Sequence, residues 1–340
     1  MKQKNNWIGK NGPLLIAEVG GNHEGSFSYA KKLVKLAIRS GVDIVKLQLY
    51  TGSTLVSKIE SKDRYKHFKK FELSKNEHIS LAKMCRSHKV GYLASVWDLE
   101  MLGWIDKYLD YYKIGSGDLT AYPIIKEFAL RGKPIILSTG LSNISEIKKT
   151  VKFIQSQNPK YKNKNNLAIL QCTSTYPTND DEINLNCITT LSNQTKMTIG
   201  YSDHSLGDLA LKAAFVKGAQ VLEFHFTDTR INKKFRDHKI SLTFKETQNV
   251  IKDISKLRKL LGMSLKKPTK NEIKSGHIKS FRRGVYPKKI LEIGHKIKME
   301  DLTFLRPNHG VDARNYKKII GKKVLKKIKP FEKISFKNVQ

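Results

Sequence analysis

Two histidines, His204 and His225, each follow a short apolar run, which makes the pair a candidate divalent-metal site. Residues 197–200 and 220–224 have the composition of buried strands, so each histidine would stand at the carboxyl end of a strand. If these strands are neighbours in a parallel sheet, both imidazoles face one opening, where neutral imidazole can hold a catalytic metal. The alternative is two unrelated histidines, one in the core and one at the surface.

Two lysines, Lys46 and Lys113, lie inside apolar runs and are candidates for binding anions. A lysine buried there is costly unless an anion pairs with it, so a carboxylate and a phosphate would suit the two ammonium groups. Hydroxyl donors for the same anions follow neighbouring runs at Ser95, Ser116 and Ser138. Two alternatives stay open: an edge lysine whose amine reaches solvent, and a Schiff-base role for Lys46, which a two-histidine metal site disfavours.

The elements that must position these groups are apolar runs that alternate with amphipathic helical patterns. The predicted strands are residues 14–19, 43–49, 91–95, 111–114, 134–137, 167–171, 197–200 and 220–224. The helical patterns include residues 27–39, 75–87, 121–129, 144–154 and 206–216. Alternation predicts a parallel sheet, and eight repeats in about 250 residues favour a closed (β/α)8 TIM barrel. A doubly wound open sheet is the alternative, but no G-x-G-x-x-G follows the first strand.

Polar or ionisable groups stand at the end of nearly every predicted strand. In a barrel these ends meet at one rim, where active sites lie. The candidates are Glu18, Lys46, Gln48, Ser95, Lys113, Ser116, Asp118, Ser138, Thr173, Ser174, Tyr176, Ser202, His204, Glu223 and His225. Their convergence predicts an active site more strongly than any single motif does.

The pattern changes after Gly262, and we predict three parts. Residues 1–262 form the catalytic barrel, residues 263–280 form a lysine-rich linker that contains Pro268, and residues 281–340 form a small β-rich domain. Within that domain, residues 284–287, 289–293 and 334–336 have the composition of short strands.

The net charge of +34 raises the question of a nucleic-acid partner. The lysines are spread along the whole chain on predicted helix faces, and neither a zinc knuckle nor an isolated basic arm is present. We therefore expect no nucleic-acid partner, while a nucleic-acid-binding protein that uses the basic C-terminal segment remains the alternative of another class.

Cysteine usage and hydropathy predict a cytoplasmic protein without a membrane partner. Cys85, Cys172 and Cys187 form no C-x-x-C and cannot all pair, which favours a reducing compartment. No apolar run approaches the roughly 20 residues needed to cross a membrane. The first apolar run, residues 14–17, is cut short by Glu18, so we expect no signal peptide.

Seven segments, in the order and with the spacing of that family, resemble the sialic acid synthase (N-acetylneuraminate synthase) family. They are Ile16-Ala-Glu-Val-Gly-Gly-Asn-His-Glu-Gly25, Val45-Lys-Leu-Gln48, Tyr112-Lys-Ile-Gly-Ser-Gly-Asp118, Ile136-Leu-Ser-Thr-Gly140, Cys172-Thr-Ser-Thr-Tyr-Pro177, Gly200-Tyr-Ser-Asp-His204 and Glu223-Phe-His-Phe226. The resemblance covers essentially the whole chain. It includes a C-terminal part similar to the antifreeze-like (SAF-type) domain of that family, with Phe281-Arg-Arg283 and Arg306-Pro307.

The resemblance implies a phosphoenolpyruvate-dependent condensation with an N-acetylated hexosamine, which gives a nine-carbon α-keto acid and phosphate. It also implies a divalent cation, Mn²⁺ or Mg²⁺, and two histidine ligands lean toward Mn²⁺ because Mg²⁺ prefers oxygen donors. N-acetylmannosamine, giving N-acetylneuraminate, is the preferred sugar. The alternative is a diacetamido-trideoxyhexose that gives legionaminate or pseudaminate.

Positions that match the family carry its residue roles as expectations. His204 and His225 match the metal ligands. The positions that hold phosphoenolpyruvate are Lys46, Ser95, Lys113, Ser116, Ser138 and Ser202. The positions that hold the amino sugar are Glu18, Asp118, Tyr176 and Asp237, and we add Gln48, Thr173, Ser174 and Glu223 as substrate-binding candidates. Arg306 matches an arginine that reaches the partner's barrel in a domain-swapped homodimer.

The chain departs from the family pattern mainly around the sugar. Trp97 and Asp98 follow the third strand, Ser174 stands where asparagine is common, and residues 235–239 replace a Gly-Pro-Asp type loop. Asn308 also stands where glycine is common after the Arg-Pro pair. We expect the loops after the second and eighth strands, residues 51–70 and 227–237, to select the sugar. Whether Glu18 transfers a proton or only binds a hydroxyl is left open.

Overall fold

The computed structural model describes residues 5–340, which fall into two compact units that meet between Gly262 and Met263. The start of the chain, for which we predict no signal peptide, lies partly outside the described residues. Among the residues that are described, no helix combines the length and the hydropathy that a membrane span needs.

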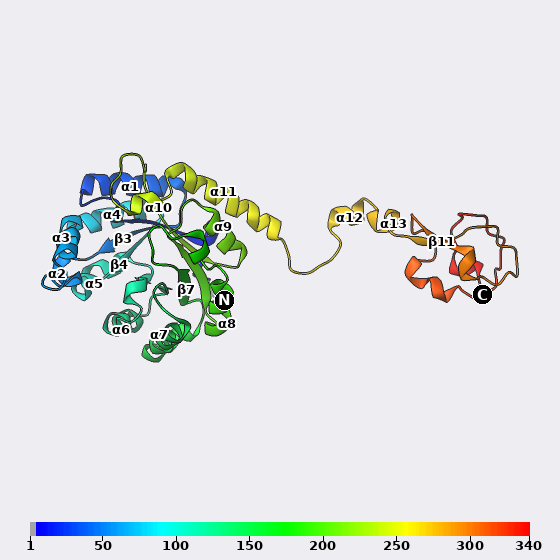
Figure 1. Ribbon diagram of the computed structural model, residues 1–340, viewed down its shortest axis with the longest axis horizontal. Helices are drawn as coiled ribbons and strands as arrows, with labels where there is room; N and C mark the ends of the chain where they lie inside the picture. The colour runs from blue at the N-terminus through cyan, green and yellow to red at the C-terminus, as the bar shows by residue number, and fades with distance from the viewer. Residues whose placement is uncertain (1–4) are drawn as a thin grey trace. The chain divides into compact units, whose positions relative to one another are not determined.

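The first unit is a closed barrel of eight parallel strands, as predicted (Figure 1). The strands are β2 (Gly12–Gly20), β3 (Ile44–Leu49), β4 (Gly91–Val96), β5 (Tyr112–Ile114), β6 (Ile135–Ser138), β7 (Leu167–Cys172), β8 (Thr198–Asp203) and β9 (Val221–His225). Each pairs with the next along the chain, and β2 pairs with β9 to close the ring. A two-residue strand, β1 (Ile8–Gly9), runs antiparallel to β2.

Helices connect the barrel strands. They are α1 (Phe27–Ser40), α2 (Gly52–Leu55), α3 (Lys62–Phe71), α4 (Lys75–Ser87), α5 (Leu99–Ile105), α6 (Tyr122–Arg131), α7 (Ile144–Gln157), α8 (Cys187–Thr195), α9 (Leu209–Val216), α10 (Asp237–Ile240) and α11 (Phe244–Leu261). Short 3₁₀ turns lie at Asp106–Tyr108, Ser116–Asp118, Pro159–Lys162 and Asp180–Glu182. Ser74 and Glu77 form a capping box that begins α4, as their spacing predicts. The helices α2 and α3 correct our reading of residues 51–70 as a loop.

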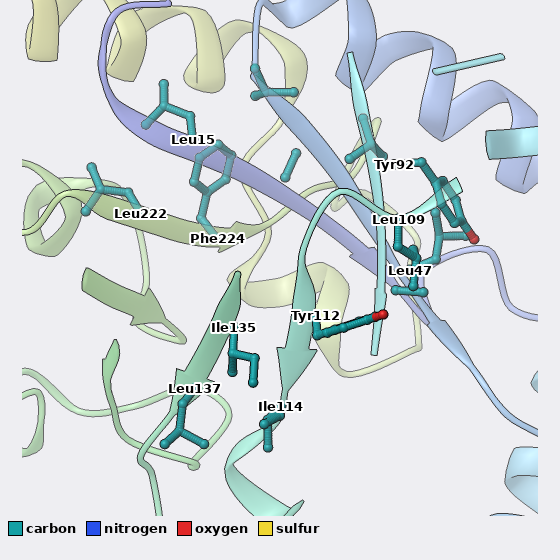
Figure 2. Close-up of a cluster of buried hydrophobic side chains, with 14 of the residues drawn as sticks. Leu15, Leu47, Tyr92, Leu109, Tyr112, Ile114, Ile135, Leu137, Leu222 and Phe224 are labelled. Atoms are coloured by element: carbon teal, nitrogen blue, oxygen red, sulfur yellow. The ribbon is translucent and has the colours of Figure 1, made fainter. Parts of the chain in front are cut away.

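Side chains on each barrel strand alternate between an outward and an inward face, and both faces are buried. The outward face contributes to the core, and polar residues on the inward face form the site. Outward side chains such as Leu15, Leu47 and Leu222 join the hydrophobic cluster that Figure 2 shows in close-up. Inward side chains near the strand starts, among them Ile16 and Ile136, form a separate apolar cluster with Trp7. Because side chains alternate with period two, the next inward positions along each strand are the polar ones at the other end of the barrel.

The second unit contains less regular structure than its sequence predicts. Strand β10 (Gly284–Pro287) pairs with β11 (Leu302–Leu305), while residues 289–293 and 334–336 do not form strands. Short 3₁₀ turns lie at Met299–Asp301, Ala313–Lys318 and Phe336–Asn338. Its core is held by buried aliphatic residues: Val285, Leu291, Ile297, Leu302, Val311, Ile319, Val324, Ile328, Ile334 and Val339.

The predicted linker, residues 263–280, contains two short helices, α12 (Lys270–Lys274) and α13 (His277–Ser280). Thr269 and Glu272 form a capping box at the start of α12, and this signal was present in the sequence. The lysine content and Pro268 favoured a prediction of irregular structure, and the capping box was overlooked for that reason.

We predict that Gly200→Ala destabilises the barrel by about 1–3 kcal/mol. A Cβ at Gly200 in β8 would lie 2.5 Å from the Val221 carbonyl oxygen, and that backbone cannot move without disturbing β9. Urea unfolding followed by tryptophan fluorescence measures this, because all three tryptophans, Trp7, Trp97 and Trp104, belong to the first unit.

The matched control is Gly103→Ala in α5, where an added Cβ meets no atom within 4 Å. Alanine has the higher helix propensity, so we expect unchanged or slightly raised stability, by up to about 1 kcal/mol. Equal stability of the two variants would contradict the close approach of β8 to β9.

Candidate active site

The carboxyl ends of the barrel strands enclose a cavity of about 880 Å³. Fifteen of the sequence-predicted residues line it: Glu18, Lys46, Gln48, Ser95, Lys113, Ser116, Asp118, Ser138, Ser174, Tyr176, Ser202, His204, Glu223, His225 and Asp237. They come from all eight strands or from the loops that follow them, so groups far apart in sequence share one chamber.

One predicted residue of the first unit, Thr173, does not line this cavity. The Thr173 hydroxyl donates to the Glu182 carbonyl at 2.9 Å and borders a neighbouring hollow, which corrects the expectation that its side chain faces substrate. Arg306 belongs to the second unit, where its guanidinium lies 5.7 Å from the centre of the Phe281 ring. Its contribution to a partner's barrel stays a prediction.

Two lysines and two glutamates form a buried charge network at the base of the cavity. Lys46 Nζ lies 2.7 Å from Glu18 Oε2 and 3.6 Å from Glu223 Oε1. Lys113 Nζ lies 3.6 Å from the same oxygen of Glu223. All four side chains are at most 7% exposed, so their formal charges must cancel within the network.

Burial and pairing shift the pKa values of these four groups in different directions. Burial raises the pKa of Glu18, although Lys46 opposes the shift. Burial acts the same way on Glu223, but Lys113 and Lys46 outweigh it and lower the pKa of that carboxyl. Burial lowers the pKa of Lys113, whereas Glu18 and Glu223 overcome burial and raise the pKa of Lys46. Glu18 is therefore the carboxyl of the pair better suited to carry a proton.

One hydroxyl contacts the Lys113 ammonium, and two others line the same cavity. Lys113 Nζ donates to Ser138 Oγ at 2.7 Å, and the Gly140 amide donates to Ser116 Oγ at 3.0 Å. Ser202 Oγ donates to Glu223 Oε1 at 3.3 Å. Together they form a positive, hydroxyl-lined corner of the kind that binds phosphate or carboxylate.

His204 and His225 lie side by side, with ring centroids 5.3 Å apart. His204 Nδ1–H donates to the Thr173 carbonyl at 2.7 Å, which leaves the Nε2 lone pair free to bind a cation. Burial lowers the pKa of His225 to about 3, so this ring is neutral, whereas Cys172 and the Thr173 carbonyl outweigh burial and raise the pKa of His204. The Nδ1 atom of His225 is buried without a hydrogen-bond partner. Two buried imidazoles that lie side by side fit a divalent metal, which binds the neutral form of each ring.

The histidines would not saturate a metal by themselves. Within residues 5–340, no three His, Cys, Asp or Glu side chains gather closely enough to hold an ion. Water and substrate oxygens would have to fill the remaining positions, and such an open coordination sphere is typical of catalytic rather than structural metal sites.

The sequence analysis missed the side chains that line the outer cavity. His67 and Phe71 from α3 pack against Phe235, with ring centroids 5.8 and 4.9 Å apart. Arg236 lies 4.1 Å above the Tyr176 ring. We predicted a loop over the residues of α3, so the helical spacing of its side chains was not used. Only the position of residues 51–70 and 227–237 after two strands indicated that these segments line the cavity.

Catalytic groups of a (β/α)8 barrel lie at the carboxyl ends of its strands, and this cavity is built there, so the chain is a barrel enzyme. It belongs to the NeuB family, which residues 33–266 match, and residues 282–339 match the SAF domain. The resemblance seen in the sequence is thereby confirmed.

Known proteins similar to this chain are named as synthases of three related acids. N,N'-diacetyllegionaminic acid synthase of Campylobacter jejuni is 33% identical over 94% of this chain and 98% of its own. Pseudaminic acid synthase of the same species is 30% identical over 93% of each. The crystal structure of N-acetylneuraminic acid (sialic acid) synthetase from Leptospira borgpetersenii, in complex with citrate, is 29% identical with a TM-score of 0.72, and covers 79% of this chain and 92% of its own.

We predict that Lys46→Met lowers the unfolding free energy of the barrel by about 3 kcal/mol, because it leaves two buried carboxylates facing one lysine. Adding Glu18→Gln should recover part of that loss, with a coupling energy of about 1–3 kcal/mol. The measurement is a double-mutant cycle by urea unfolding.

The control is Lys69→Met, which removes an exposed lysine 2.8 Å from Glu72 on the same unit. We expect a cost of no more than about 1 kcal/mol. Additive effects of the Lys46 and Glu18 substitutions on the free energy of unfolding would show that these two residues are not energetically coupled.

Proposed function

We propose that this enzyme condenses phosphoenolpyruvate with an N-acetylated amino sugar, releasing phosphate and forming a nine-carbon α-keto acid. The observation that carries the proposal is the pairing, in one cavity, of two buried lysines with two buried histidines. Phosphoenolpyruvate has two anionic groups for the lysines, and the aldehyde of an open-chain sugar needs the polarisation that a cation on the histidines would supply. The names of the relatives support the same reaction class.

In this proposal Lys46 and Lys113 hold the carboxylate and phosphate of phosphoenolpyruvate, with hydroxyls of Ser95, Ser116 and Ser138 as further donors. Both lysines are already surrounded by fixed dipoles and carboxylates, so little reorganisation accompanies binding. Fixing the two anionic groups orients carbon 3 toward the sugar and removes an entropic part of the barrier.

The reaction then balances without any further reagent. Carbon 3 of phosphoenolpyruvate bonds to the aldehyde carbon, water adds at carbon 2, and the carbon–oxygen bond to phosphate breaks. The raised pKa of Glu18 suits it to exchange a proton with a sugar hydroxyl or with the attacking water. His204 and His225 are the residues that would hold Mn²⁺, or Mg²⁺, which supplies Lewis-acid polarisation of the aldehyde.

For the sugar, two candidates follow from different observations. N-acetylmannosamine is the sequence-based expectation. Similarity to a diacetyllegionaminic acid synthase favours a diacetamido-trideoxyhexose, and the aromatic wall of Phe71 and Phe235 suits a deoxy methyl group better than a hydroxymethyl group. We propose the second as the better fit to the outer cavity. The homodimer with Arg306, the cytoplasmic location and the absence of a nucleic-acid partner stay predictions.

The test of the reaction is phosphate release from phosphoenolpyruvate with Mn²⁺ and a panel of N-acetylated hexoses that includes both candidates. We expect release with at least one sugar, and a product whose mass equals sugar plus pyruvic acid. Salt-sensitive DNA binding with no phosphate release from any sugar would overturn the proposal in favour of a nucleic-acid-binding protein.

We predict that His225→Ala abolishes metal-dependent phosphate release, because one imidazole cannot hold the cation in a catalytic position. His88→Ala, at the exposed end of α4, is the matched control and should keep full activity. Comparison of rates with and without chelator checks both. Unchanged activity of His225→Ala would remove the metal site from the mechanism.

A further inference from the structure

The two candidate metal-binding histidines differ in what their Nδ1 atoms contact. His204 Nδ1–H donates to the Thr173 carbonyl at 2.7 Å, which holds its ring in place. His225 Nδ1 is buried and has no hydrogen-bond partner. A buried imidazole nitrogen without a partner is costly, so a group nearby should complete it when the site is loaded.

The group that lies opposite this nitrogen is a carboxylate. Asp237 Oδ2 is 3.8 Å from His225 Nδ1, and both side chains are at most 7% exposed. The other carboxylate oxygen, Oδ1, is bound by the Arg236 guanidinium through Nε and Nη2, each at 2.9 Å. Arg236 thus occupies one oxygen of Asp237, while the second oxygen faces the histidine.

We infer that Asp237 is a positioning residue that accepts a hydrogen bond from His225 Nδ1–H and thereby directs His225 Nε2 toward the cation. This inference rests on the metal site of the proposed function and deepens it. A movement of about 1 Å brings the two atoms to hydrogen-bond distance. Histidines that bind metals usually donate the second ring N–H to a carboxylate or carbonyl, which fixes the tautomer and the ring orientation.

With that bond, both histidines take the same tautomer. Thr173 O would select Nδ1–H on His204, and Asp237 would select Nδ1–H on His225, so that both Nε2 lone pairs are available together. The resemblance assigns Asp237 to the sugar instead. The two roles differ in a measurable way, because only the positioning role changes metal affinity when no sugar is present.

The experiment is a Mn²⁺ titration of the full chain without substrates, followed by the electron paramagnetic resonance signal of free Mn²⁺. We expect Asp237→Ala to weaken binding about 10- to 100-fold. Asp237→Asn should lose less, because its amide oxygen still accepts from Nδ1–H. Thermal unfolding of each variant checks that the barrel is folded.

The control is Asp118→Asn, which makes the same chemical change as Asp237→Asn in the same cavity. Asp118 accepts from Trp97 Nε1 at 2.6 Å rather than facing a histidine, so Mn²⁺ affinity should stay within about twofold of the parent chain. It separates loss of a cavity carboxylate in general from loss of the carboxylate beside His225.

Three outcomes decide the matter. Weakened binding in Asp237→Ala with normal binding in Asp118→Asn supports the inference. Parent-like Mn²⁺ affinity in Asp237→Ala overturns it while leaving the metal site intact. If the parent chain binds Mn²⁺ no better than His225→Ala does, the metal site of the proposed function fails, and the positioning role fails with it.

Discussion

The site depends on keeping two lysine ammonium groups charged inside a barrel that excludes water. An isolated ammonium there would lose its proton or unfold the structure, because burial disfavours the charged form. Glu18 and Glu223 prevent this: one carboxylate is paired with Lys46, and the other lies between both lysines. The cavity can therefore keep both ammonium groups charged before any substrate arrives.

The closed parallel sheet makes that network possible. On β2, β3 and β9, in-register neighbours place Glu18 beside both Lys46 and His225. Period-two alternation sends the intervening residues outward to the hydrophobic cluster, while apolar inward residues fill the other end of the barrel. The same backbone that forms the core thus separates a dry apolar end from a charged end, and a phosphate-bearing substrate can bind only at the second.

The outer part of the cavity is formed by loops and by the short helix α3 rather than by strands. His67 and Phe71 of α3 contact Phe235 of a segment far away in the sequence, with stacked rings for His67 and tilted rings for Phe71. Asp228 helps to hold the later segment in place, because it accepts from Tyr29 Oη at 2.6 Å and pairs with Lys32 at 2.7 Å. The strands determine the reaction class, and these segments, which vary most easily, are suited to select the sugar.

The sequence by itself determined the barrel, its strand order and the polar cavity-lining residues at the strand ends, since the hydrophobic period and the strand-end position are local properties of the chain. It also identified the family through long ordered motifs such as residues 16–25 and 200–204. It did not predict α3, the outward turn of the Thr173 hydroxyl, or the failure of residues 289–293 and 334–336 to form strands. Nor did it predict that Asp237 faces His225 while Arg236 holds its other oxygen. Those features depend on contacts between distant segments, and only the tertiary structure decides which side chains meet when loops of different strands close over one cavity.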